Sequence, residues 1–325
     1  MLCEKPLALW RNKPRLCPSP QKLAPWPVFP SARQAITRAL RLGGLSRAHR
    51  IAVPEWSSHC VLSAVGWRAT PIGIRESLRY AIPVDAVLVY EQWGWPFVPE
   101  AYEEIESHFK GCFLLWDQVD SSHFLQPRAP GFVAPTARVV SLSKLLGYPG
   151  GGLLTMNNEY VHPPKEAVSG LTQALLDLPA DCQTSFEFKE AFKNGAEILH
   201  PHADLLVREN DIPSAIEMER LDRCRNAEAL LQSPLVSSWP RWMCAAVARG
   251  LAPGIAPLMR GETVERMTAC RDRVEMELGI RGEIYNFDWN GNPMRSAYEP
   301  CLAVPLHGQV QSIEELISRV LRAMA

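Results

Sequence analysis

The chain has 325 residues, of which 47% are hydrophobic and 21% are charged, and its formal net charge is −1. This size and composition predict a globular protein of about two domains, and the balanced charge favours neither a nucleic acid nor an anionic membrane as partner. The nine cysteines form no Cys-x-x-Cys pair, and no signal peptide or spanning apolar run is evident, so we expect a cytoplasmic protein with reduced thiols.

The N-terminal 30 residues contain seven prolines and several basic residues. We interpret residues 1–30 as an irregular arm that lies over the fold or over a partner subunit. The next segment has the pattern of a helix that begins after Ser31 as its N-cap, with an apolar face of Ala35, Ile36, Ala39 and Leu40. The free N–H groups of a helix start can bind phosphate, although a capped surface helix is the simpler interpretation of this segment alone.

Short apolar runs then alternate with helical patterns. The runs are Arg50–Val53, Pro71–Ile74, Ala86–Tyr90 and Cys112–Trp116, and helices are predicted at about Ser58–Val65 and Glu100–Phe109. Apolar strands separated by helices predict a mostly parallel sheet that is buried on both faces. Ligands of such sheets bind beyond the carboxyl ends of the strands, where we expect Asp117, Trp93–Trp95 and Ser141–Lys144 to converge.

Lys144 lies in the stretch Ala137–Leu154, between a β-branched run and a glycine triplet followed by further apolar residues. A lysine in apolar surroundings loses hydration, which lowers its pKa and makes its amine a nucleophile. The alternative is a lysine whose ammonium reaches solvent from a turn. Only the sequence context of Lys144 can distinguish these two interpretations.

Asp117 after a strand, followed by Ser141-x-x-Lys144 and a glycine-rich turn, resembles the active-site order of the fold-type-I pyridoxal 5'-phosphate (PLP) enzymes. More narrowly, six ordered blocks resemble the DegT/StrS-type sugar aminotransferases: PSARQAI, IAVPEWSSHCVLSAVGWRATPI, VLVYEQWGWP, FLLWDQVDSS, SLSKLLGYPGGGLL and CLAVPLHG. The resemblance covers most of residues 28–325. It implies an α/β protein with a three-layer αβα large domain, a mostly parallel sheet, and a smaller C-terminal α+β domain.

The resemblance also implies a division of the chain and a homodimer. Residues 1–30 would be the N-terminal arm, residues 31–215 the large cofactor-binding domain, and residues 216–325 the linking helix with the small domain. Each active site would be completed by the partner subunit. Asn210 falls where relatives present an asparagine to the neighbouring subunit's phosphate.

Within the site, the resemblance assigns catalysis to Lys144 and Asp117. Lys144 would attach the cofactor through its amine and move protons, and Asp117 would pair with the protonated pyridine nitrogen. The cofactor phosphate would be bound by a hydroxyl of Ser141 and, mainly through backbone N–H groups, by Ser31, Ala32, Arg33 and Gln34. Two rings remain candidates for stacking on the pyridine face, namely Trp56 and His59.

Three features depart from the family pattern. The spacing from Ser141 to Lys144 resembles the broader aminotransferase class rather than many sugar aminotransferases. Relatives often carry Gln or His three residues after the aspartate, against the pyridine hydroxyl, whereas Asp120 would bring a second negative charge there. Ala32 and Arg33 replace the glycine and threonine that are usual in the phosphate loop. These departures leave the expected PLP cofactor in place and weaken the assignment of a substrate.

The implied reaction moves an amino group from a glutamate- or glutamine-like donor to a keto sugar or related polar keto compound in a biosynthetic pathway. One alternative is a PLP-dependent lyase or condensing enzyme on the same fold. Another is a non-catalytic binding or regulatory protein on this scaffold. We expect no metal site, because His200 and His202 have no acidic cluster beside them and are more typical of a loop.

The C-terminal half contains several helical patterns. Amphipathic helices are predicted at Lys165–Asp177 and Phe186–Leu199, and Ile216–Leu231 resembles the helix that joins the two domains. A final helix is predicted at Ile313–Met324, with Ser312 and Glu315 as its capping box. The aromatic and amide side chains of Tyr285–Arg295 suit either a substrate mouth or a surface loop.

Overall fold

The computed structural model describes residues 8–11, 15, 28–29, 31–125, 136–148, 151–163, 211–279, 282–310 and 312–324. Within these residues a seven-stranded sheet has the order β2-β1-β3-β4-β5-β6-β7. The pairs from β2 to β5 are parallel, and β5–β6 and β6–β7 are antiparallel. The strands are β1 (Arg50–Val53), β2 (Thr70–Gly73), β3 (Ala86–Tyr90), β4 (Phe113–Asp117), β5 (Ala137–Ser141), β6 (Gly152–Met156) and β7 (Glu159–Tyr160).

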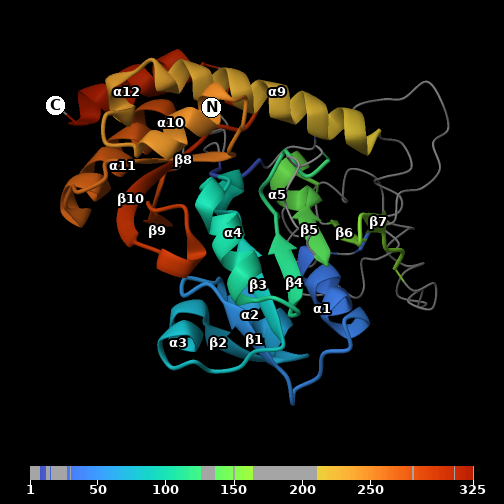
Figure 1. Ribbon diagram of the computed structural model, residues 1–325. Helices are drawn as coiled ribbons and strands as arrows, with labels where there is room; N and C mark the ends of the chain where they lie inside the picture. Colours follow the sequence, from blue (N-terminus) through green and yellow to red (C-terminus); the bar gives the residue numbers. More distant parts are fainter. Residues whose placement is uncertain are drawn as a thin grey trace.

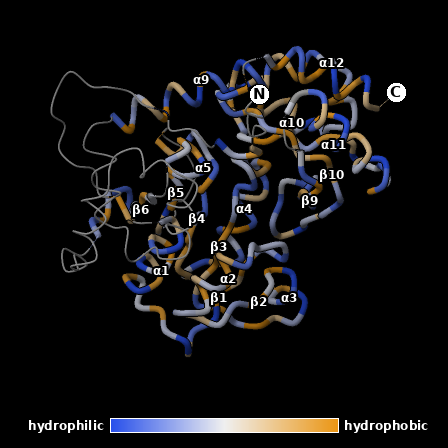
Figure 2. Tube along the Cα trace, turned by 180° about the vertical axis from the view of Figure 1, so that it is seen from behind, coloured by the Kyte–Doolittle hydropathy of each residue, from blue (hydrophilic) through white to orange (hydrophobic). Residues whose placement is uncertain are grey.

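Helices cover both faces of this sheet (Figure 1). Alternate residues of a strand point to opposite faces, and here Leu88 packs with α1 and α2, whereas Val87 packs with α3 and α4. Figure 2 shows the apolar character of these strands. The predicted three-layer arrangement is therefore confirmed. The helices are α1 (Ala32–Leu42), α2 (His59–Gly66), α3 (Ile74–Arg79) and α4 (Pro99–His108).

The sequence-based boundaries differ from the observed ones by only a few residues. The predicted apolar face of α1 is buried as expected, because Ala35, Ile36, Ala39 and Leu40 all face the sheet. After β5 the chain forms a short helix, α5 (Leu142–Leu146), which ends at Gly147 with a left-handed φ of 72°. Lys144 therefore lies on a helix that directly continues from the end of a strand.

A second, three-stranded antiparallel sheet, β8-β10-β9, follows in the C-terminal part of the chain. Helix α9 contacts α5 at one end and α10 and α12 at the other, so it joins the two sheets (Figure 1). The elements of this part are α9 (Ile212–Leu231), α10 (Arg241–Ala248), β8 (Ile255–Leu258), α11 (Val264–Leu278), β9 (Glu283–Asp288), β10 (Tyr298–Pro305) and α12 (Ile313–Met324), with 3-10 turns at Gln92–Gly94, Pro234–Val236 and Pro293–Arg295.

The observed bounds of two of these helices can be compared with the bounds predicted from the sequence. Helix α9 begins at Ile212 rather than Ile216, because the Asp211 carboxylate accepts a hydrogen bond from the Ser214 N–H and caps it there. Helix α12 has the predicted bounds, and the Ser312 hydroxyl accepts the Glu315 N–H at 3.2 Å. Among the helices described, none combines the length and apolar character that a transmembrane span requires.

Some predictions fall outside the described residues. They are the helices at Lys165–Asp177 and Phe186–Leu199, the pair His200 and His202, and the candidate phosphate ligand Asn210.

Candidate active site

The carboxyl ends of β3, β4 and β5 bring three polar side chains together. Tyr90, Asp117 and Ser141 are the last residues of these neighbouring parallel strands, and the register places Tyr90 directly beside Asp117. Helix α5 begins immediately after Ser141 and carries Lys144 over the same edge. The structure therefore brings Asp117, Ser141 and Lys144 to this edge of the sheet, as expected, and adds Tyr90 to them.

Asp117 is a buried carboxylate with one described hydrogen bond. Asp117 is only 2% exposed, and its Oδ1 accepts a hydrogen bond from the Val119 N–H at 3.2 Å. Burial raises the pKa of Asp117 to about 7, although the nearby Lys144 ammonium partly opposes this shift. A carboxylate with so little hydrogen bonding in a buried site would be stabilised by a cationic N–H donor placed against it.

The Lys144 ammonium faces acidic and aromatic groups. Its Nζ lies 3.5 Å from Oδ2 of Asp120 and 5.1 Å from the centre of the Trp10 ring, and 37% of its side chain is exposed. Burial by itself would lower the pKa of Lys144, but the charges of Asp120 and Asp117 outweigh it, so the pKa is raised. The expectation of a lowered pKa is therefore wrong for the chain by itself, because it considered only the loss of hydration and not the effect of the two expected carboxylates on the Lys144 amine.

Asp120 is the centre of this group of side chains. It is 2% exposed, and its carboxylate accepts the Trp10 indole N–H at 2.9 Å and the Tyr90 hydroxyl at 2.6 Å, besides pairing with Lys144. Burial and the Asp120 charge raise the pKa of Tyr90, so its hydroxyl stays a donor. The expected second negative charge is present, and the Lys144 ammonium compensates it.

The start of α1 lies against the segment that follows α5. Gly152 pairs with Ser141 in the β5–β6 register, and a Cβ on Gly152 would lie 2.6 Å from the Ala32 nitrogen. The Ser31 and Ser141 hydroxyls each accept a backbone N–H, from Gln34 at 3.3 Å and from Lys144 at 3.4 Å, and so cap α1 and α5. Arg33 and Gln34 lie in the first turn of α1, so the expected phosphate-binding residues are brought together around Gly152.

The two rings expected over the pyridine lie at the start of α2. Trp56 is 58% exposed and packs against Tyr298 at a ring distance of 6.2 Å, and His59 is the exposed first residue of α2. The neighbouring Cys60, the second residue of α2, is close enough to Lys144 to influence its pKa. The ring described over Lys144 itself is that of Trp10.

Sequence reasoning missed Trp10, Tyr90 and Cys60 as neighbours of Lys144. Tyr90 could have been found, because it ends an apolar strand at the ligand-binding edge of the sheet. Cys60 is adjacent to the predicted His59. Nothing in the sequence around Trp10 marks it, because a tryptophan in a proline-rich arm belongs to no helical or strand period.

Comparison with known proteins gives a family for part of the chain. Residues 24–164 match the model of a family described as "Putative PLP-dependent aminotransferase". Through this segment, the chain is a relative of the PLP-dependent aminotransferases. This match supports the predicted relation to PLP-dependent aminotransferases and the predicted PLP cofactor, and no curated protein matches the chain.

Solved structures share the fold of this aminotransferase relative. A DegT DnrJ EryC1 StrS aminotransferase from Brucella abortus is 13% identical, with a TM-score of 0.53 over 91% of this chain and 84% of its own. A "putative sugar aminotransferase" from Streptococcus pneumoniae, in its PMP form, is 14% identical, with a TM-score of 0.53 over 91% and 86%. A "putative O-acetylhomoserine (thiol)-lyase" from Campylobacter jejuni has 14% identity and a TM-score of 0.53 over 91% and 80%. These likenesses confirm the fold-type-I architecture.

The residues of this aminotransferase relative fit PLP. Asp117 offers a desolvated carboxylate to a pyridinium N–H, and Lys144 offers a primary amine within electrostatic reach of that carboxylate. The Gly152 position, where a Cβ would collide with the start of α1, keeps helix N–H groups close to Ser141. Among the described residues, no cluster of three or more His, Cys, Asp or Glu side chains could hold a metal ion.

Proposed function

We propose that this aminotransferase relative moves an amino group from a glutamate- or glutamine-like donor to a keto sugar or a related polar keto compound in a biosynthetic pathway. The observation that carries the proposal is the placement of the buried Asp117 carboxylate and the Lys144 amine at one edge of the sheet, Asp117 as the last residue of β4 and Lys144 on the helix that follows β5, near enough for each charge to shift the pKa of the other. PLP bound there would supply an electron sink for the substrate's amino carbon.

The chain's own groups have separate tasks in this proposal. The Asp117 carboxylate would accept a hydrogen bond from the ring nitrogen of the bound cofactor and favour the protonated form of that nitrogen. Lys144 would contribute the nucleophilic amine and, in its free form, would carry a proton to or from the substrate carbon. Asp120 sits 3.5 Å from Nζ, so it stabilises the ammonium whenever Lys144 holds that proton. Ser31, Ala32, Arg33, Gln34 and Ser141 would bind the phosphate.

Cofactor uptake and transamination test this proposal directly. The purified protein mixed with PLP should gain a visible absorbance band, which Lys144→Ala should abolish. Lys110→Ala, at an exposed lysine after α4, is the matched control and should retain the band. Mixing the loaded protein with a panel of amino donors should yield pyridoxamine phosphate by mass spectrometry. A protein that never takes up PLP would refute the proposal.

The proposed enzyme would work as a homodimer with shared sites. Apolar side chains on and next to α2 support this, since Trp56, Leu62 and Trp67 are 58%, 36% and 76% exposed. Sedimentation equilibrium should give twice the chain mass, and Trp67→Glu should lower it towards the monomer. We place the enzyme in the cytoplasm, which is supported by the six described cysteines all being free.

A lyase or condensing reaction is the second candidate. It is favoured by the likeness to the lyase from Campylobacter jejuni, whose TM-score equals that of the Brucella abortus aminotransferase. The same donor panel distinguishes the two, because a lyase consumes its substrate without leaving pyridoxamine phosphate. A chain that binds PLP but changes no substrate would instead be a binding or regulatory protein.

A further inference from the structure

The N-terminal arm enters the active site through Trp10. Its indole N–H donates to Oδ1 of Asp120 at 2.9 Å, and the face of its ring lies 5.1 Å from Nζ of Lys144. The far side of the indole meets the edge of Tyr285 on β9, at 6.4 Å between ring centres. The Trp10 side chain therefore contacts Asp120, Lys144 and strand β9 of the three-stranded sheet.

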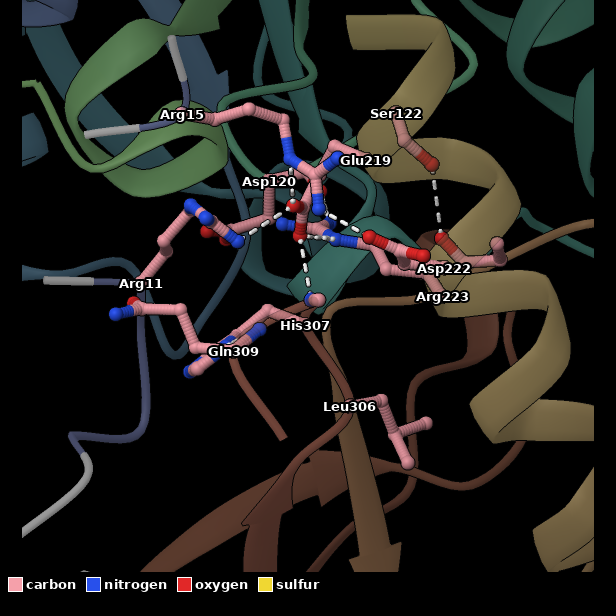
Figure 3. Close-up of polar contacts among 12 residues, drawn as sticks. Arg11, Arg15, Asp120, Ser122, Glu219, Asp222, Arg223, Leu306, His307 and Gln309 are labelled. Carbon is pink, nitrogen blue, oxygen red and sulfur yellow. Dashed lines mark hydrogen bonds and ion pairs between the residues drawn. The ribbon is translucent and has the colours of Figure 1, made fainter. Parts of the chain in front are cut away.

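Glu219 on α9 anchors the arm at this place. It is fully buried, and its carboxylate binds Arg11 at 3.0 Å and Arg15 at 3.2 Å, both from the arm (Figure 3). Arg223, one turn along α9, binds the same carboxylate at 2.9 Å and also donates to the Asp120 carbonyl oxygen at 2.8 Å. Glu219 thus fixes the arm and the backbone of Asp120 with one buried charge.

Further contacts hold the arm on both sides of this anchor. Arg15 also pairs with Asp222 on α9, and its N–H donates to the Leu146 carbonyl at the end of α5. His307, which follows β10, makes a 3.0 Å hydrogen bond to the Ala8 carbonyl. Gly308 donates its N–H to Glu219 at 3.2 Å. Residues 8–11 and 15 are therefore bound to α5, α9 and the loop after β10.

We propose that Trp10 is a positioning residue for the catalytic amine, and that Glu219 holds it there. The inference rests on the proposed function only in that Lys144 is taken as the reacting amine. Trp10 acts in two ways. Its N–H fixes one oxygen of Asp120, which leaves the other oxygen turned to Lys144. Its ring face attracts the ammonium by a cation–π interaction.

The Lys144 amine is surrounded by charged groups from several elements, so the role of Trp10 has to be separated from theirs. Asp117 on β4, Asp120 after β4 and Cys60 on α2 all favour the ammonium. Tyr90 on β3 donates to the Asp120 oxygen that pairs with Lys144. Substituting Trp10 changes none of these groups chemically, so a shift in the titration of Lys144 would report the loss of the Trp10 ring and of its hydrogen bond to Asp120.

The test is the pH dependence of Lys144 labelling in the cofactor-free chain. An amine-acylating reagent reacts only with the free amine, and mass spectrometry of the Lys144 peptide gives its rate at each pH. Trp10→Ala should lower the midpoint of this profile by about one pH unit, which is about a tenfold higher free-amine fraction below the midpoint. Trp10→Phe keeps a ring but loses the N–H donor, and it should give a smaller shift.

Tyr80→Ala is the matched control, because this aromatic residue at the end of α3 is 61% exposed and lies outside the proposed site and dimer surface. Its labelling midpoint should equal that of the unchanged protein. If Trp10→Ala also leaves the midpoint unchanged, Trp10 does not position the amine and the inference is wrong. The labelling uses no cofactor, so a failure of PLP uptake would refute the proposed function without affecting this result.

The anchoring role of Glu219 is tested with two Glu→Gln variants on α9, each of which removes one negative charge. Glu219→Gln should reproduce the midpoint shift of Trp10→Ala, because the arm loses its buried partner. Glu217→Gln removes a carboxylate that is 51% exposed and pairs with Arg220 on the same helix, and it should have no effect. If Glu219→Gln does not fold, Arg11→Ala removes only one contact of the arm and should shift the midpoint in the same direction. A shift by neither variant would refute the anchoring role.

Discussion

The Lys144 ammonium pairs with Asp120 at 3.5 Å and also partly offsets the rise that burial causes in the pKa of Asp117. One cation therefore stabilises two buried carboxylates. Without the cofactor, Asp117 lacks a cation of its own. PLP would supply one through its ring nitrogen and free Lys144 from part of this task. The cofactor-free chain is therefore expected to carry an electrostatic cost that binding relieves.

The first prediction concerns Asp117→Asn in the cofactor-free chain. Burial raises the pKa of Asp117 to about 7 in the folded chain, whereas an unfolded chain has a pKa of about 3.9. As pH rises between these values, the unfolded state releases the proton first, so the folded state loses stability. Above pH 7 this loss reaches at most about 4 kcal/mol, and Asp117→Asn should recover it.

Urea unfolding at pH 5 and pH 8 measures this effect. Asp117→Asn should stabilise the cofactor-free protein more at pH 8 than at pH 5, while weakening PLP binding. The control is Asp272→Asn on α11, whose side chain is 62% exposed and pairs with its neighbour Arg271. Equal effects of Asp117→Asn at both pH values would contradict a raised pKa.

The sequence predicted the sheet and the position of Asp117 and Lys144, and the reason is local. Strands β3 and β4 are apolar on both faces, and a polar residue at the end of such a strand lies at the ligand-binding edge. Trp10 could not be found this way. Its position depends on Arg11 and Arg15 meeting Glu219, contacts between residues about 200 positions apart that no sequence period encodes.

The candidates Trp56 and His59 show a second limit of prediction from the sequence. The motif predicted an aromatic or imidazole ring over the cofactor, but the pattern fixed only the start of α2. Which side chain of that turn faces the site depends on how the helix is rotated against its neighbours, and the sequence pattern does not specify this rotation. Adjacent residues on a helix differ by about 100° in direction, so a slip of one residue changes the face.

Gly152→Ala should disrupt the phosphate side of the site. An added Cβ would lie 2.6 Å from the Ala32 nitrogen and 2.7 Å from the Ser31 carbonyl carbon, which are backbone atoms that cannot turn aside. The helix start must shift, at a cost of about 1–3 kcal/mol. Gly66→Ala is the control, because nothing lies within 4 Å of its Cβ position at the end of α2.

The measurements for Gly152→Ala are urea unfolding and the affinity for PLP compared with pyridoxal, which lacks the phosphate. The variant should lose affinity for PLP and little for pyridoxal. An equal loss for both ligands would show that the start of α1 does not bind the phosphate.

His307 should make the protein's stability depend on acidity. Burial lowers the pKa of His307 to about 4, against about 6.5 in the unfolded chain. Below pH 6.5 His307 binds a proton in the unfolded state but stays neutral in the folded state. Up to about 3 kcal/mol of stability is therefore lost as pH falls towards 4. The neutral ring also suits its contacts, because Nδ1 accepts the Gln309 N–H while Nε2 faces the Ala8 carbonyl.

His307→Gln cannot gain that proton, so its free energy of unfolding should fall less between pH 7 and pH 4.5 than that of the unchanged protein. His108→Gln, at an exposed histidine that ends α4, provides the comparison and should retain the original pH dependence. If both variants follow the unchanged curve, the ring of His307 takes up its proton in the folded state as readily as in the unfolded one.

Tyr90→Phe should destabilise the site edge without leaving a cavity. The Tyr90 hydroxyl donates to Asp120 at 2.6 Å and accepts the Trp93 N–H at 3.2 Å, and Trp93 has a left-handed backbone with φ of 58°. Removing the hydroxyl leaves the strained turn and the buried carboxylate each short of one partner, which costs about 1–3 kcal/mol. Tyr80→Phe, at a tyrosine 61% exposed, should change the urea midpoint very little. Equal midpoints for the two variants would mean that the Tyr90 hydroxyl contributes no more than an exposed one, and that other contacts maintain the turn at Trp93.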